Sequence, residues 1–181
     1  MLASLWVVWY LARLGPAHVR DGSAAGIAWC PAPPAGYAAA LGCAVLMALL
    51  ALLIFHLVPP DASRLENLPM AKLLTAHGLA VLPVLLLGAL LAPLVEEFVF
   101  RGIAFGGIAS RLGPAWAAVV TTLAFTLAHA QQKLHYWPGF IAVGLFAVLA
   151  AALRLKYRSI RPGILLHILY NGSFLLAGTL T

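Results

Sequence analysis

Charged residues are scarce in this sequence: Asp, Glu, Lys and Arg together make up 9% of the 181 residues. An ordinary soluble domain is about 25% charged and about 45–50% apolar. Here the hydrophobic share is 64% and the mean hydropathy is +1.00, which excludes an ordinary soluble domain. The composition instead predicts an all-α, polytopic membrane protein.

Cysteine is also rare, and Cys30 and Cys43 fit neither a metal-ligand spacing nor a disulfide framework. The net charge is +6, but no basic patch with interleaved aromatic residues appears, so nucleic acid is excluded as a partner. The basic residues lie between apolar runs, where they are typical of membrane topology.

Six apolar segments predict about six transmembrane helices in one bundle, forming a single integral-membrane domain over residues 1–181. They are Leu2–Leu14, Gly36–Val58, Leu73 to about Ala109, Pro114–Ala130, Pro138–Leu153 and Gly163–Leu180. The first is short for a span, and the third is too long for a simple one and contains Pro83 and Pro93, which predict kinks. A loop, Gly15–Ala35, and a polar link, Asp61–Lys72, join the first three segments.

The distribution of basic residues predicts the orientation in the membrane. Four of them crowd the short loop before the last segment, so we expect that loop to be cytoplasmic: Arg154, Lys156, Arg158 and Arg161. Alternating back through six spans places Arg13, Arg20, Arg101 and Arg111 on the same side, and Arg64, Lys72 and Lys133 outside. Both termini are then predicted to lie outside.

Three charges stand together in an apolar stretch, at Glu96, Glu97 and Arg101. A charge at bilayer depth costs about 2.5–3.5 kcal/mol on insertion scales. Glu97 and Arg101 are four residues apart and so share one helix face, where they can pair. Glu96 points about 100° away from that face, which leaves it as the candidate reactive carboxylate that takes a proton from water.

Two later segments supply partners for Glu96. The turn at Gly113-Pro114 separates two helical arms of similar length, which brings Glu96 and His129 to a similar depth. His167 and Asn171 are four residues apart on a helix returning from the cytoplasmic side, and they offer donors for a developing oxyanion. The sequence therefore predicts a buried catalytic site in the cytoplasmic half of the membrane.

Each part of this group also has a structural interpretation. Glu97 with Arg101 could be a plain ion pair, His129 a helix-end residue, and His167 with Asn171 an interhelical hydrogen-bonded pair. Their conjunction favours a site, because few structural clusters need two acids, two histidines and an amide. Histidines outside this group are interpreted as structural or interfacial: His18, His56, His77 and His135. Aromatic residues near segment ends are interpreted as interface anchors, among them Trp116, Tyr136 and Trp137.

The order and spacing of these motifs resemble a known family. Glu96-Glu97-x-x-x-Arg101, then Phe125-x-x-x-His129, then His167-x-x-x-Asn171 is similar to the pattern of the CAAX protease and bacteriocin-processing (Abi-type) intramembrane proteases, which are related to the type II CAAX prenyl endopeptidase. The run Arg161-Pro162-Gly163 into His167 resembles that family as well. The resemblance covers about residues 90–176.

The resemblance implies an intramembrane endopeptidase of a prokaryotic inner membrane, with its site towards the cytoplasm. It implies Glu96 as general base, His129 as a residue that activates water, and His167 with Asn171 as the oxyanion hole. Glu97 and Arg101 would support them. No cofactor is favoured, and zinc held by the Glu and the two His remains the alternative. The expected partners are the lipid bilayer and a membrane-associated peptide or protein.

Few helices precede the first motif, so a prenylated substrate is less expected than another membrane-associated peptide. Two other interpretations remain open. A non-catalytic immunity or scaffold protein could share the fold, and a small transporter could use Glu96 as a proton relay, although Asn171 has no clear part in that.

Overall fold

The described part of the chain is helical, in agreement with the predicted all-α class. A computed structural model describes residues 20–59, 82–83, 86–130 and 136–180, without the side chains of residues 176–180, and these ranges contain no strand. The predicted first segment, Leu2–Leu14, and the link Asp61–Lys72 lie outside them. The number of membrane crossings and their orientation therefore stay predictions.

Four of the predicted apolar segments form long helices with bounds close to those expected. They are α3 (Pro34–Leu57), α9 (Pro114–Ala128), α11 (Pro138–Tyr157) and α12 (Arg161–Leu180). Prolines open α3, α9 and α11, where a missing N–H is harmless because the first turn has no partner for it. Among the described residues, α3 and α11 are long and apolar enough to cross a membrane, and α9 is a shorter apolar helix.

The third predicted segment, which we ended near Ala109, is an unbroken helix from Leu86 to Leu112. It consists of η2 (Leu86–Leu91), α7 (Ala92–Glu97), η3 (Phe98–Ala104) and α8 (Phe105–Leu112), where η2 and η3 are π-helical. We predicted a kink at Pro93, and the structure has a widened π-helical turn directly before this proline. Because proline lacks an N–H and crowds the preceding turn, a wider turn accommodates it without a break.

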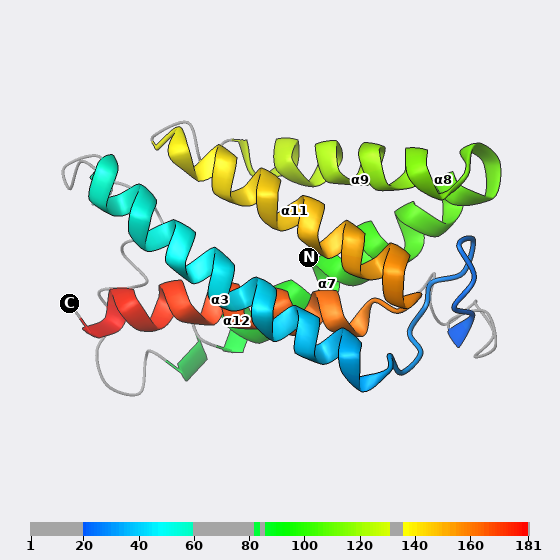
Figure 1. Ribbon diagram of the computed structural model, residues 1–181, viewed down its shortest axis with the longest axis horizontal. Coiled ribbons are helices and arrows are strands. Elements are labelled where there is room, and N and C mark those ends of the chain that lie inside the picture. Colours follow the sequence, from blue (N-terminus) through cyan, green and yellow to red (C-terminus); the bar gives the residue numbers. More distant parts are fainter. Residues whose placement is uncertain (1–19, 60–81, 84–85, 131–135, 181) are drawn as a thin grey trace.

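A tight hairpin joins this long helix to α9. Gly113 has φ +84°, a conformation that favours glycine, and its N–H donates to the Ala109 carbonyl at 3.1 Å to close α8. Pro114 then begins α9, so the two arms run back along each other (Figure 1). This is the hairpin that the sequence predicted from Gly113-Pro114.

In the bundle, α11 crosses between α9 on one side and α3 with α12 on the other (Figure 1). The main apolar core lies where these helices meet and includes Met47, Phe125, Phe146 and Leu166. The outer face of α3 is apolar but exposed, with Leu49 60% and Leu52 67% accessible. An apolar face of this kind suits lipid contact rather than water.

The C-terminal end of α11 corrects one prediction. We placed Arg154 in a cytoplasmic loop, but α11 continues to Tyr157 and Arg154 is a helical residue that is 2% exposed. Arg154 can be buried because its guanidinium donates hydrogen bonds to three backbone carbonyls, those of Ser23, Gly26 and Arg101. A buried cation with its donors satisfied is tolerable, whereas an unsatisfied one is not.

Candidate active site

Glu97 lies at the centre of the predicted group and is fully buried. Its Oε1 accepts a hydrogen bond from Arg101 Nη1 at 3.0 Å and lies 3.1 Å from His167 Nδ1. The pair of Glu97 and Arg101 on one helix face is thus present as predicted. Glu97 also connects the long helix to α12, because His167 lies in the second turn of α12.

Arg101 makes further contacts that keep its charge inside the bundle. Its Nη2 donates to the Ala147 carbonyl of α11 at 3.1 Å, and its guanidinium carbon lies 4.3 Å from the centre of the Phe125 ring. A carboxylate, a carbonyl and an aromatic face together replace much of the water that this cation loses, while its Nε has no hydrogen-bond partner among the described residues. Arg101 therefore fixes Glu97 from within the protein.

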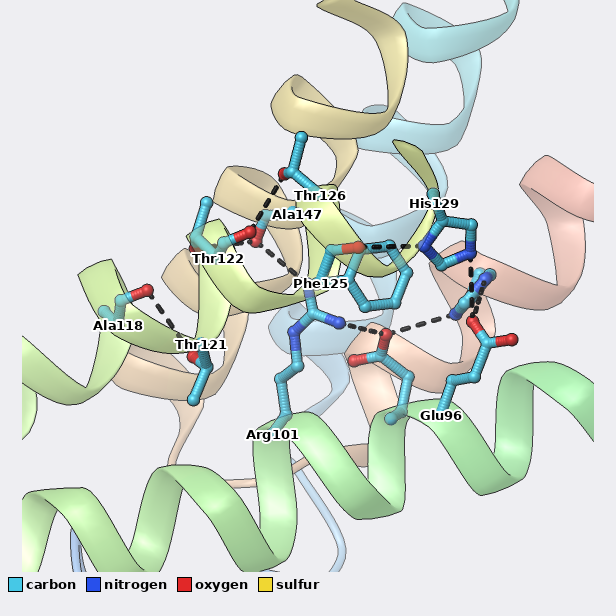
Figure 2. A network of polar contacts seen from close by, with 11 residues as sticks. Glu96, Arg101, Ala118, Thr121, Thr122, Phe125, Thr126, His129 and Ala147 are labelled. Atoms are coloured by element: carbon cyan, nitrogen blue, oxygen red, sulfur yellow. Dashed lines mark hydrogen bonds and ion pairs between the residues drawn. The ribbon is translucent and has the colours of Figure 1, made fainter. Parts of the chain in front are cut away.

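The two histidines direct the same ring atom to Glu96. His129 ends α9, and its Nδ1 lies 2.9 Å from the Phe125 carbonyl; a carbonyl only accepts, so Nδ1 is the donor (Figure 2). His167 Nδ1 likewise donates to Glu97 Oε1, the same carboxylate oxygen that accepts from Arg101 Nη1. In each neutral ring Nε2 is then an acceptor, and each Nε2 lies 3.7 Å from Glu96 Oε2.

Glu96 differs from Glu97 in lacking a close partner. Its side chain is 31% exposed, yet Oε2 is buried and has no hydrogen bond among the described residues. At 3.7 Å both imidazoles are too far for a direct hydrogen bond. One carboxylate oxygen and two ring nitrogens, all acceptors, thus converge, an arrangement that a donor such as water could bridge.

Two aromatic rings pack against the imidazoles. Phe125 lies 4.5 Å from the His129 ring and 5.8 Å from that of His167, and Phe146 of α11 lies 4.4 Å from His167 (centroid distances). The sequence reasoning did not identify Phe146, since one Phe in an apolar run carries no signal of its own. Together these rings limit the rotation of the histidines and exclude water from their faces.

Asn171 lies one turn beyond His167 on α12. Its hydrogen bond is to the backbone of η2 and not to Glu96 or either histidine. Its Nδ2 donates to the Gly88 carbonyl of η2 at 3.0 Å, which ties α12 to the long helix. An amide nitrogen has two N–H groups, so one donor of Asn171 remains beyond this bond. The predicted oxyanion role of Asn171 stays a prediction.

The remaining candidates for chemistry lie outside this cluster. Cys30 and Cys43 are free thiols, and His56 is an exposed residue in the last turn of α3. The other three histidines that we considered structural, His18, His77 and His135, fall outside the described residues. Within the described ranges, no group of three or more His, Cys, Asp or Glu side chains is arranged to hold a metal ion.

These observations define an all-helical protein with apolar helices of membrane-spanning length and a buried carboxylate–histidine cluster. A comparison with protein families identifies the relationship: the model of the type II CAAX prenyl endopeptidase Rce1-like family matches residues 78–173, more than half of the chain. The chain belongs to this family, as its three motifs predicted, and is a membrane protein of the CAAX protease type. No curated protein and no solved structure matches it.

Proposed function

We propose that the protein is an intramembrane endopeptidase that hydrolyses a peptide bond of a membrane-associated protein or peptide, on the cytoplasmic side of a prokaryotic inner membrane. The observation that carries the proposal is the convergence of Glu96 Oε2 with the Nε2 atoms of His129 and His167, at 3.7 Å from each. Membership of the type II CAAX prenyl endopeptidase family supports a protease in general.

In the proposed reaction a water molecule donates to Glu96 Oε2 and to His129 Nε2. Glu96 removes one proton as the water oxygen attacks the substrate carbonyl carbon, and it later gives that proton to the leaving amine when the C–N bond breaks. The products are one carboxyl terminus and one amine terminus. No group is consumed, so Glu96 returns to its ionised form.

The oxyanion of the tetrahedral intermediate needs donors, for which we propose His167 and Asn171. His167 Nδ1 already donates to Glu97, so Nε2 can donate to an oxyanion only in the imidazolium form. In the proposed reaction His167 takes this second proton from solvent before the water attacks, and the Glu97 carboxylate lies beside the ring at 3.1 Å from Nδ1. The proposed role of the Glu97–Arg101 pair is therefore to hold His167 in place and to provide the negative charge that its protonated form requires.

A zinc-dependent version of the same protease is the second candidate. Two imidazoles and a carboxylate are ligand types that zinc accepts, although the described side chains are not arranged as a metal site and these three would have to move closer together. Glu96, His129 and His167 would then hold the ion, which would supply an activated water. We favour the metal-free reaction, in which Glu96 is left to act as the base.

The experiment compares the wild-type protein with Glu96→Gln in detergent, using a quenched-fluorescence peptide library and mass spectrometry of the products. The amide keeps the shape of Glu96 but cannot take the proton, so we expect a fall in cleavage of about 10²–10⁴-fold. His129→Ala and His167→Ala should also be inactive, with exposed His56→Ala as the matched active control. Cleavage by Glu96→Gln at the wild-type rate would reject Glu96 as the base. A wild-type protein that cleaves nothing, while its histidine variants keep a binding or protective activity, would favour the non-catalytic scaffold.

A further inference from the structure

Arg154 is a buried cation whose hydrogen-bond acceptors are main-chain oxygens from two distant segments. Its Nη2 donates to the carbonyls of Ser23 and Gly26, each at 2.9 Å, and its Nε donates to the carbonyl of Arg101 at 3.2 Å. The guanidinium carbon also lies 4.9 Å from the centre of the Phe105 ring. Ser23 and Gly26 belong to the N-terminal loop, defined here as residues 21–33, so Arg154 joins this loop to α11 and to η3.

The acceptor at Arg101 connects Arg154 to the candidate active site. Arg101 lies in π-helical η3, where the usual i→i−4 hydrogen-bond register is interrupted and carbonyls become available to side chains. The side chain of the same residue holds Glu97, and Glu97 Oε1 holds His167 Nδ1. A continuous path of hydrogen bonds thus runs from the N-terminal loop through Arg154, Arg101 and Glu97 to His167.

A second set of contacts fixes the N-terminal loop on the same stretch of helix. A Cβ atom added at Gly102 would lie 2.9 Å from Ile27 Cγ2, and one added at Gly106 would lie 2.7 Å from the Ala25 carbonyl oxygen. The loop backbone therefore rests directly on the long helix within the two turns after Arg101. At neighbouring Gly107 an added Cβ would meet nothing within 4 Å, so the close approach is confined to one face.

We infer that Arg154 is a positioning residue, which couples the N-terminal loop to His167 by holding the backbone of Arg101. The inference rests on the proposed function, because the orientation of His167 matters for hydrolysis only if His167 acts there. Arg154 lies outside all three family motifs, and the inference gives this buried cation a function. The loop on the far side of Arg154 is then a structural support of the active site.

The first test reads His167 directly and does not depend on cleavage. The full chain is labelled with ¹⁵N-histidine in detergent micelles, and long-range ¹⁵N–¹H spectra give the tautomer of each ring, with His167→Gln assigning the signal. The wild type should show a proton on His167 Nδ1, and Arg154→Gln should shift or broaden the signals of this ring. Arg158→Gln is the matched control, because exposed Arg158 also bonds a loop carbonyl, that of Gly22 at 3.0 Å, but has no bond to Arg101.

A second pair of variants keeps the inference testable if Arg154→Gln does not fold. Gly106→Ala pushes against the loop carbonyl of Ala25, while Gly107→Ala makes the same chemical change on the open side of the same helix. We expect Gly106→Ala to alter the His167 signal and to lower kcat about 10- to 100-fold with little change in KM, since small displacements of catalytic groups have effects of this size. Gly107→Ala should behave as wild type.

The outcomes separate this inference from the proposed function. Unchanged His167 signals and an unchanged kcat in Arg154→Gln and Gly106→Ala would overturn the inference, even if thermal stability falls, and would leave the protease proposal intact. Shifted His167 signals in both variants, with Arg158→Gln and Gly107→Ala unaffected, would support the coupling. A wild-type protein without any cleavage activity would count against the protease, whereas the spectra would still test the coupling.

Discussion

Arg101 and Arg154 link the long helix and α11 in both directions. Arg101 Nη2 donates to the Ala147 carbonyl of α11 at 3.1 Å, and Arg154 Nε, from α11, donates to the Arg101 carbonyl at 3.2 Å. Both side chains are almost completely buried. The two helices are thereby fixed against each other one turn away from Glu97, so the carboxylates of the candidate site lie on packed helices rather than on a loop.

Breaking the Glu97–Arg101 pair should be costly, because a single substitution leaves the other partner buried and uncompensated. We expect Glu97→Gln to lower the free energy of unfolding by about 3–5 kcal/mol, as for other broken buried pairs. The double variant Glu97→Gln with Arg101→Met should lose less than the sum of the two single changes. Unfolding by denaturant in detergent micelles measures all four proteins. Additive losses would show that the two side chains are not coupled.

Gly163 in the first turn of α12 gives room to Glu97, since a Cβ there would lie 3.0 Å from Glu97 Oε2. Gly163→Ala should displace this carboxylate and destabilise the protein by about 1–3 kcal/mol, the usual range for overpacking. It should also lower the cleavage rate through His167. Gly172→Ala, on the same helix, is the control, because its Cβ would meet Ala89 Cβ at an ordinary 3.9 Å. The two variants should differ in both thermal unfolding and kcat; equal behaviour would contradict the role of Gly163.

Asn171 has a structural hydrogen bond and a proposed catalytic one, and a single variant can separate them. Loss of the bond to Gly88 in Asn171→Ala should cost about 1 kcal/mol of stability. Loss of an oxyanion donor should lower kcat by about 10²–10³-fold. Unfolding and steady-state kinetics on one preparation measure both effects. A stability loss with normal kcat would leave Asn171 as a helix–helix link only.

Removal of metal discriminates between the two versions of the protease. In the reaction that we favour, a chelator leaves cleavage unchanged and the purified protein carries no stoichiometric zinc. If chelation instead abolishes cleavage and added zinc restores it, Glu96, His129 and His167 become ligands. Glu96→Gln would then weaken zinc binding as well as activity, which metal analysis of the variant measures.

The sequence predicted contacts between side chains of the candidate site better than it predicted the hydrogen bonds to backbone carbonyls that hold the surrounding helices together. The spacing of Glu97 and Arg101 on one helix face was enough to predict their ion pair, since i,i+4 neighbours meet on any helix. The equal arms about Gly113-Pro114 brought His129 to the depth of Glu96, and the return of the last helix from the cytoplasmic side brought His167 there as well. These relations follow from helix geometry and from motif order, both of which a sequence displays.

The supports depend on backbone atoms, which the residue pattern does not reveal. Arg154 stands in a basic run and was assigned to a loop, but its acceptors are the carbonyls of Ser23, Gly26 and Arg101, and no side-chain pattern identifies a carbonyl. The bond from Asn171 to the Gly88 carbonyl was missed for the same reason. Basic residues near the predicted end of a helix are therefore poor evidence that a loop begins there. They can belong to the helix and be buried when a neighbouring segment offers backbone carbonyls as acceptors.

The buried Oε2 atom of Glu96, which has no hydrogen bond among the described residues, has a practical consequence. A carboxylate oxygen held next to two acceptor nitrogens is a local instability, and proteins retain such strain where chemistry requires it. Replacing Glu96 by Gln removes the repulsion between the carboxylate and the two acceptor nitrogens, so the Glu96→Gln variant should melt at a higher temperature than the wild type. In the proposed protease, the Glu96→Gln variant should bind its substrate without cleaving it, and peptides captured by this variant would identify the natural target.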